Sequence, residues 1–147
     1  MNRRNFFSQV LSKKPTSFFT FSYSHCTVQP LYPLYNLSTC VASLQACAND
    51  ENLTRGQQIH SYMLTNDFLN SPFSVTSLIS MYSKCNRMDY AISIFNSSSH
   101  ECNVFAYNTI IAGFIANGLA GNGFEFYKQM RVVGVMADKF TFPCGMI

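Results

Sequence analysis

The residues best suited to chemistry in this chain of 147 residues are its cysteines and histidines. Their side chains bind metals, form disulfides and act as nucleophiles or bases. The six cysteines share no short spacing: Cys26, Cys40, Cys47, Cys85, Cys102 and Cys144. No pair forms Cys-x-x-Cys, and no cysteine is spaced from a histidine as in a zinc finger. We therefore expect structural cysteines, with no metal site and no cofactor.

The three histidines offer no catalytic arrangement. His25 lies near the N-terminus, His60 within a predicted helix and His100 in a predicted turn, and none has a supporting motif. Ser, His and Asp occur together in any chain of this length, so their presence alone does not indicate a catalytic triad. We expect that the chain is not an enzyme and has no small-molecule substrate, and that His60 is a packed or solvent-facing helix residue.

The feature that does recur is a pattern of apolar residues. Three segments can be placed in register, residues 37–71, 72–103 and 104–138, and a fourth copy begins at residue 139. The fifth residues of the four copies are Val41, Thr76, Asn108 and Pro143, at steps of 35, 32 and 35 residues. Periods of this length are typical of repeat architectures.

Each segment is predicted to form two helices on either side of a short polar break. In residues 104–138 the helical faces contain Tyr107, Ile110, Ile111 and Phe114, then Ala120, Phe124, Tyr127 and Met130. The corresponding residues of the first two segments are Leu37, Val41, Leu44, Ala48, Ile59, Tyr62 and Met63, then Leu78, Ile79, Tyr82, Ala91, Ile94 and Phe95. Gly134 suits the end of the last helix.

A helix pair cannot cover its own apolar face, so neighbouring pairs must stack. The sequence therefore predicts an all-α fold, an α-solenoid of stacked helix-turn-helix repeats with almost no strand. The fourth copy, residues 139–147, is incomplete. We expect an exposed apolar end, and a chain that is a fragment of a longer protein, a truncated gene model or a pseudogene product.

The N-terminal segment carries the positive charge. Arg3, Arg4, Lys13 and Lys14 precede the first acidic residue, Asp50, and the remainder of the chain has six basic and seven acidic residues. A basic, Ser- and Phe-rich segment without acidic residues is typical of an organellar transit peptide, which we place in residues 1–30. A mitochondrial address is favoured over a chloroplast one, and a disordered basic tail is the alternative. No apolar run is long enough to span a membrane.

The repeated segments resemble the pentatricopeptide repeat family, specifically its plant subclass of mixed repeat lengths. Residues 104–138 are similar to the standard motif in VFAYNTIIAGFIANG, FEFYKQMRVVGV and the closing Asp138. Residues 72–103 resemble the short motif in SLISMYSKCNRMDYAISIF. Residues 37–71 resemble the long motif in SLQACANDENLTRGQQIHSYML, as does DKFTFP at the start of the fourth copy. Gly121 and Gly123 depart from the pattern, with an expected cost of about 1 kcal/mol for each glycine in a helix.

The resemblance implies binding of single-stranded organellar RNA, one base per repeat. The fifth and closing residues of a repeat would contact the base edge. Thr76 with Asn103 resembles an adenine reader, and Asn108 with Asp138 resembles a uracil reader, which gives 5′-A-U-3′. Phe73 and Phe105, at the second positions, would flank the bases. Val41 and Ser71 form no readable pair in the long repeat.

Two alternatives to base reading are considered. Asn, Asp and Thr are also common at helix starts because they cap backbone groups, and Cys102 could be the closing residue in place of Asn103. Ala91-x-x-x-Phe95 fits part of the tetratricopeptide signature of a peptide-binding scaffold, but the Trp and the terminal Pro of that signature are missing.

The resemblance also implies a role in RNA processing or modification, such as C-to-U editing, with other RNA-processing proteins as candidate partners. The sequence has neither the His-x-Glu nor the Cys-x-x-Cys of a deaminase zinc site.

Overall fold

The structure, a computed structural model, describes residues 36–98 and 103–141. All of these belong to one of two compact units of the chain, residues 34–147. The predicted transit peptide lies outside the described residues, and so does the end of the fourth copy, 142–147. The same holds for several residues discussed above: His25, Cys26, His100, Cys102, Pro143 and Cys144.

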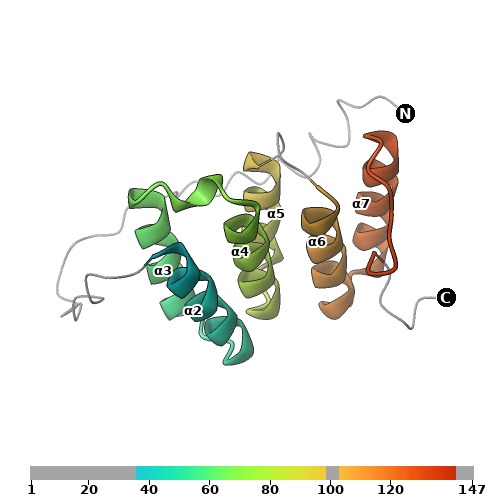
Figure 1. Cartoon of the computed structure of the whole chain (residues 1–147). Helices are drawn as coiled ribbons and strands as arrows, with labels where there is room; N and C mark the ends of the chain where they lie inside the picture. Colours follow the sequence, from blue (N-terminus) through green and yellow to red (C-terminus); the bar gives the residue numbers. More distant parts are fainter. Residues whose placement is uncertain (1–35, 99–102, 142–147) are drawn as a thin grey trace. The chain divides into compact units, whose positions relative to one another are not determined.

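Three consecutive pairs of α-helices make up the described part of the chain (Figure 1). The first helices of the pairs are α2 (Leu37–Asn49), α4 (Pro72–Lys84) and α6 (Val104–Ala116). The second helices are α3 (Leu53–Thr65), α5 (Met88–Ser97) and α7 (Ala120–Val132), and a short 3₁₀ helix, η1 (Phe68–Asn70), leads into α4. No strand occurs within residues 36–98 or 103–141. The all-α repeat fold is therefore confirmed.

The first helix of every pair ends in the same backbone turn. The second residue after each of these helices has a positive φ: Glu51 at 51°, Asn86 at 58° and Gly118 at 72°. The N–H of the following residue then donates to a carbonyl five residues earlier, in Asn52 to Cys47, Arg87 to Tyr82 and Leu119 to Phe114. This Schellman arrangement satisfies helix-end carbonyl groups and reverses the chain. It occurs at the three breaks that the sequence predicted.

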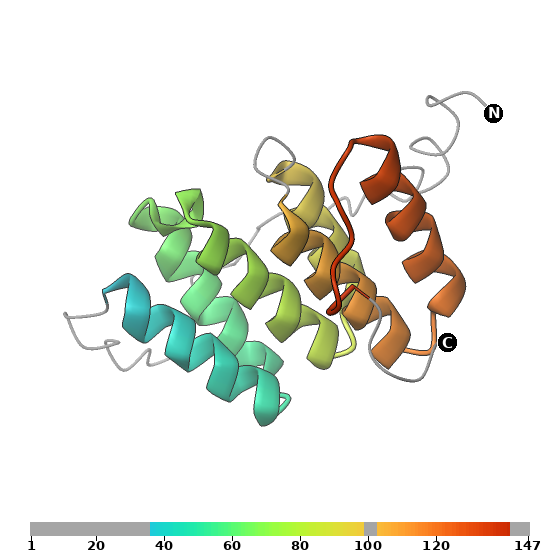
Figure 2. The same ribbon diagram turned by 45° about the vertical axis from the view of Figure 1, so that its right-hand side comes forward.

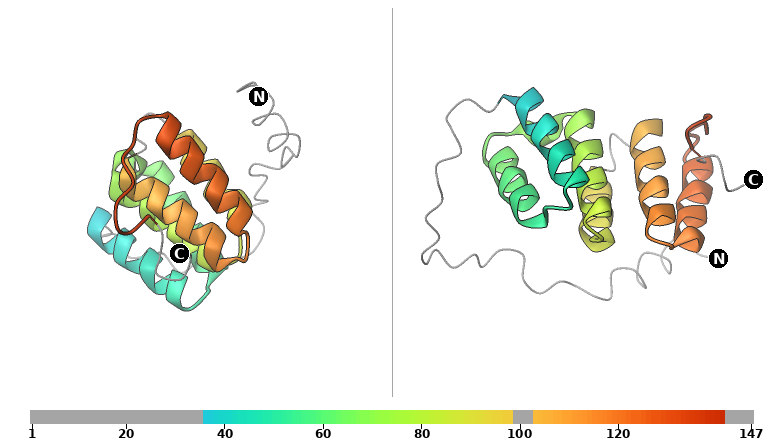
Figure 3. Two further views of the ribbon diagram at one scale, coloured as in Figure 1. Left: turned by 90° about the vertical axis from the view of Figure 1, so that its right-hand side faces the viewer. Right: turned by 90° about the horizontal axis from the view of Figure 1, so that it is seen from below.

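The first helices form one continuous layer. Helix α4 packs against α2 on one side and α6 on the other, and Figure 2 shows the three helices side by side. Each second helix packs mainly on the first helix of its own pair, and α3, α5 and α7 make few contacts with one another. The three pairs follow one another in chain order, as the right-hand view in Figure 3 shows. Equivalent residues of α4 and α6 are thus brought to one layer.

The core lies between the two layers. Leu78, Ile79, Ile110 and Ile111 are fully buried, and Tyr82, Phe95, Tyr107 and Phe114 are almost so. Burying a large apolar side chain contributes roughly 1.5–3 kcal/mol, so these residues dominate the stability of the stack. The faces predicted for α4 and α6 are confirmed. No helix of the described residues has the length and apolar character needed to cross a lipid bilayer.

The face predicted for α7 is partly wrong. Met130 is buried, but Ala120 is exposed and Phe124 is 49% exposed. The buried face contains Gly123, Phe126 and Met130 instead. Gly123 lies close enough to α6 that an added Cβ would stand 3.5 Å from the Ile111 carbonyl oxygen. Glycine adds no side chain to an apolar pattern, so the sequence pattern places Phe124 on the packed face in its stead.

The C-terminal end of α7 follows the prediction. Gly134 has φ 82°, its N–H donates to Arg131 O, and the N–H of Val135 donates to Met130 O. This is the same Schellman arrangement as at the ends of the first helices, and it turns the chain back toward α6. Residues 133–138 then run without regular structure to Asp138.

Candidate nucleic-acid interface

Two large aromatic side chains are exposed at the starts of neighbouring first helices. Phe73 is the second residue of α4 and is 73% exposed, and Phe105 is the second residue of α6 and is 65% exposed. Phe140, after α7, is 64% exposed. The three phenylalanines recur at the interval of the repeats. Exposed rings of this kind are what stacking of single-stranded bases requires.

The structure brings Asn108 and Asp138 together. The Asn108 Nδ2 atom on α6 donates a hydrogen bond of 2.8 Å to Asp138 Oδ1, thirty residues further along the chain. The amide orientation is fixed by this contact, because an amide oxygen facing the carboxylate would be repelled. Asn108 Oδ1 consequently points inward, where it is buried and has no hydrogen-bond partner among the described residues. The second Nδ2 hydrogen is the polar group that Asn108 offers to a ligand.

The Asp138 carboxylate is held by several donors on one oxygen. Asp138 Oδ1 also accepts from the Phe140 N–H at 2.9 Å and from Thr141 Oγ1 at 3.2 Å. Desolvation raises the pKa of Asp138, but the hydrogen bonds from Asn108, Phe140 and Thr141 together outweigh it, so the pKa lies below its ordinary value. The carboxylate is ionised at neutral pH. In the described residues no hydrogen bond uses its other oxygen, Oδ2, which is thus an available acceptor beside the Asn108 amide.

Thr76 and Asn103 are not joined in this way. The Thr76 hydroxyl donates to Pro72 O at 3.0 Å and to Phe73 O at 3.2 Å within its own helix. Asn103 Oδ1 accepts from Ala106 N at 3.1 Å and caps the start of α6. No hydrogen bond between the two side chains is found in the described residues. Both are half-buried, and each makes the helix-start contacts that are the alternative to base reading.

The first repeat differs from the other two. Val41 is half-buried and apolar, and Ser71 stands at the start of α4 without a side-chain capping bond. Its first helix carries no exposed aromatic residue at the second position, which is Ser38. The described groups suited to a base edge or a base face are therefore concentrated on α4, α6 and the segment after α7.

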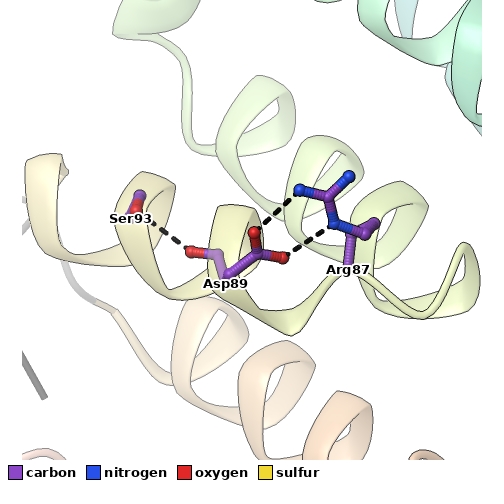
Figure 4. Close-up of polar contacts among 3 residues, drawn as sticks. All are labelled: Arg87, Asp89 and Ser93. Carbon is purple, nitrogen blue, oxygen red and sulfur yellow. Dashed lines mark hydrogen bonds and ion pairs between the residues drawn. The ribbon is translucent and has the colours of Figure 1, made fainter. Parts of the chain in front are cut away.

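The layer of first helices carries very little charge. Lys84, the last residue of α4, is the one charged side chain in α2, α4 and α6, and its Nζ donates to Asn49 Oδ1 at 3.0 Å. Charged side chains lie instead on the second helices. Figure 4 shows Arg87 beside Asp89 at the start of α5. The Arg87 Nε and Nη2 atoms donate to the Asp89 carboxylate at 3.0 and 2.8 Å, and the Ser93 hydroxyl donates to the Asp89 carbonyl.

The cysteines and the histidine within the described residues are packing residues. Cys40 and Cys47 are buried, and burial raises the pKa of both thiols, which disfavours the reactive thiolate. His60 Nδ1 lies 3.0 Å from the Tyr82 hydroxyl, and the two rings meet edge to face. Burial lowers the pKa of His60. Within residues 36–98 and 103–141 no three His, Cys, Asp or Glu side chains gather as metal ligands.

Two residues near the Asn108–Asp138 pair were missed. Phe140 occupies the second position of the fourth copy, like Phe73 and Phe105 in theirs, so the register itself could have identified it. Thr141 is fully buried and bonds to Asp138 through both its backbone and its side chain. No local sequence signal distinguishes it from an ordinary helix-start threonine.

Stacked helix pairs with equivalent residues in one layer define a helical-repeat protein. The family model of the PPR repeat matches residues 73–98 and 105–135. A pentatricopeptide repeat-containing protein of Arabidopsis thaliana is 43% identical over 113 residues, which are 76% of this chain and 17% of that protein. A second such protein of the same plant is 36% identical over 107 residues, 73% of this chain and 23% of that protein. This chain therefore belongs to the pentatricopeptide repeat family.

A third relative, whose name includes the word chloroplastic, is 33% identical over 69% of this chain and 20% of its own length. The chain thus spans about a fifth of the length of these relatives. Proteins of the family are organellar, bind RNA through their helical repeats and are generally non-catalytic.

Proposed function

We propose that this chain is a non-catalytic, single-stranded RNA-binding segment of an organellar pentatricopeptide repeat protein. The observation that carries the proposal is the Asn108–Asp138 pair. It places an amide donor next to an ionised carboxylate, close to the start of a helix that also presents an exposed ring. A donor beside an acceptor matches the Watson–Crick edge of a base, which also alternates donors and acceptors.

The proposed base lies between aromatic rings. Phe105 belongs to the same repeat as Asn108, and Phe140 follows Asp138 by two residues, so both rings are near the polar pair. Both have most of their surface exposed, 65% and 64%, and so are free to stack. Stacking on an aromatic ring is worth about 1–3 kcal/mol per base and tolerates any base. The rings would supply affinity, and the polar pair would supply preference.

The preference we propose is 5′-A-U-3′, with adenine at the repeat of residues 72–103 and uracil at that of 104–138. The two positions rest on different support. Asn108 and Asp138 are hydrogen-bonded to each other, whereas Thr76 and Asn103 are engaged with helix-start backbone groups. The Asn103 Nδ2 group and the lone pairs of the Thr76 hydroxyl are still able to contact a base. We expect the uracil preference to be the stronger of the two.

A change of base preference tests the proposal. Wild type, Asn108→Thr and Asn122→Thr would be titrated with short single-stranded RNAs that vary the base opposite the third repeat. Asn122 is an exposed asparagine on α7 and serves as the matched control. We expect Asn108→Thr to move the preference from uracil toward guanine and the control to leave it unchanged. An unchanged preference in Asn108→Thr would remove the assignment.

We further propose a mitochondrial location, with residues 1–30 as the transit peptide and the chloroplast as the alternative. The support is the basic, acid-free composition of that segment. Expression of residues 1–35 fused to a fluorescent protein would test it, with a variant in which Arg3, Arg4, Lys13 and Lys14 become glutamine as the control. A diffuse cytosolic signal from the unmodified segment would contradict the proposal.

The proposed process is RNA modification or processing, C-to-U editing in particular, in which this segment selects the RNA and other proteins act on it. The resemblance to the mixed-length subclass is the support for that step. Loss of editing at a site that contains the dinucleotide, in a plant lacking the gene, would be the expected result. A plant with fully edited organellar transcripts would count against it.

A further inference from the structure

A hydroxyl recurs at the third position of the repeats. The third residues are Thr39, Ser74, Ala106 and Thr141, and three of the four carry a hydroxyl. Ser74, Ala106 and Thr141 each stand three residues after the residue that closes the preceding repeat, and Thr39 stands three residues after Asn36. The third residue is thus placed to contact the residue three positions before it, although the Ser74 hydroxyl donates instead to Phe68 O. At Ala106 and Thr141 that earlier residue, Asn103 or Asp138, is a closing residue proposed to contact RNA.

Thr141 makes this contact with Asp138 in both directions. The Asp138 N–H donates to Thr141 Oγ1 at 2.9 Å, and Thr141 Oγ1 lies 3.2 Å from Asp138 Oδ1, to which it donates. The Thr141 N–H also donates to the Asp138 carbonyl at 3.1 Å. Thr141 is fully buried, so the hydroxyl has no bulk water to bond with in place of these groups. The arrangement resembles a capping box, in which two residues satisfy each other reciprocally.

The start of α2 has a related arrangement. Thr39 Oγ1 lies 3.2 Å from Asn36 Oδ1 and donates to the Asn36 carbonyl at 2.8 Å. At the start of α6 the third residue is Ala106, which has no hydroxyl. Among the described residues the Asn103 side chain accepts a hydrogen bond from the backbone N–H of Ala106 and from no hydroxyl. The closing residue supported by a hydroxyl, Asp138, is bonded to the fifth residue of its repeat, and the unsupported one, Asn103, is not.

We infer that Thr141 is a positioning residue, whose hydroxyl holds the Asp138 carboxylate against Asn108 and thereby sets the base preference of the repeat formed by residues 104–138. The inference rests on the proposed RNA-binding function. With Oδ1 fixed by Asn108, Phe140 and Thr141, the second oxygen of Asp138 is kept in one orientation toward the ligand. Without the hydroxyl the carboxylate rotates more freely, and donor and acceptor no longer match one base edge.

The test exchanges the hydroxyl for a methyl group of the same size. Full-length wild type, Thr141→Val and Thr141→Ser would be titrated with short single-stranded RNAs that carry uracil or another base opposite the third repeat. We expect Thr141→Val to lower the preference for uracil about three- to tenfold, the factor that corresponds to one hydrogen bond. Thr141→Ser, which keeps the hydroxyl, should restore the preference.

Thr39→Val is the matched control, because it removes an equivalent threonine hydroxyl from the start of α2. It should leave the uracil preference unchanged even if it lowers stability as much as Thr141→Val does. If Thr141→Val does not fold, Thr141→Cys replaces it, since a thiol is a weak donor of similar size. If Thr141→Val, or Thr141→Cys in its place, keeps the full preference for uracil, the inference about Thr141 is overturned while the proposed function stands.

A second readout does not need RNA. The hydroxyl of Thr141 contributes to the lowered pKa of Asp138, so Thr141→Val should raise that pKa toward its ordinary value in an NMR titration of the free chain. An unchanged Asp138 pKa would overturn the inference. A wild-type chain with no base preference at all would overturn the proposed function, and the inference with it, and so is distinguishable from failure of the inference alone.

Discussion

Gly113 is the position at which the stacking of α4 and α6 can be tested most sharply. A Cβ added there would lie 2.4 Å from Ser83 Oγ and 2.9 Å from Ser83 Cβ. Ser83 has little room to move: its hydroxyl donates to Ile79 O at 2.7 Å, and its carbonyl accepts from Asn117 Nδ2 at 2.9 Å. Gly113→Ala therefore forces α4 and α6 apart or displaces Ser83.

The expected cost follows from two opposing effects. Overpacking a tight contact costs typically 1–3 kcal/mol. Replacing glycine by alanine within a helix raises the free energy of unfolding by about 1 kcal/mol, because alanine has the higher helix propensity. Rotation of the serine hydroxyl relieves only one of the two close contacts, since the distance to Ser83 Cβ stays below 3 Å. We expect Gly113→Ala to lower the free energy of unfolding by about 0–2 kcal/mol, the difference between these two effects.

The assay is urea denaturation followed by circular dichroism, with Gly121→Ala as the matched control. Gly121 lies near the start of α7, and nothing stands within 4 Å of its added Cβ. The control should raise the free energy of unfolding by about 0.4–1 kcal/mol. The double variant Ser83→Ala/Gly113→Ala should be less destabilised than the sum of its single changes, because the two side chains compete for one space.

The reasoning is refuted if Gly113→Ala is as stable as Gly121→Ala. That result would mean that α4 and α6 adjust their separation freely. The equivalence of the Thr76 and Asn108 positions across the two helices would then lose its physical basis, because it depends on a fixed stacking distance.

Four further outcomes are expected. Glu51→Gly should raise the free energy of unfolding by about 0.5–1 kcal/mol in urea denaturation, since a non-glycine residue in the left-handed region is strained. Lys84→Gln should reduce the slope of log affinity against log salt by about 1 in RNA titrations if its ammonium contacts a phosphate; an unchanged slope excludes that contact. Burial lowers the pKa of His60 below its ordinary value of 6.5, so the stabilisation linked to neutral His60 is complete above pH 6.5 and is lost as the pH falls below it. His60→Gln should abolish that part of the pH dependence of unfolding. Phe105→Ala should weaken RNA binding by about 1–3 kcal/mol for every base, without a change in preference.

Much of the fold could be predicted from the sequence because the apolar spacing and the breaks are both local signals. Tyr107, Ile110, Ile111 and Phe114 form a strong 3.6-residue pattern, and Asn117-Gly118 is a strong turn signal. The face of α7 was misassigned because Gly123 packs through its backbone, and a residue without a side chain leaves no trace in an apolar pattern. The left-handed conformation of Glu51 could not be predicted from its residue type, because it is imposed by the hydrogen bonds at the end of α2.

The candidate site was only partly accessible from the sequence. The register identified Asn108 and Asp138 as the fifth and the closing residue of one repeat, but the hydrogen bond between them depends on how residues 133–138 return to α6. The buried Asn108 oxygen and the role of Thr141 follow from that return path as well. The difference between Asp138 and Asn103 could not be predicted, because both residue types are good helix caps.

The unequal packing of the two layers has a mechanical consequence. Helices α2, α4 and α6 contact one another along the stack, whereas α3, α5 and α7 are nearly independent of each other. Such a stack can bend by a change in the spacing between the second helices while the contacts within the layer of first helices are kept. The distance between the Thr76 and Asn108 positions then changes little while the curvature of the stack varies.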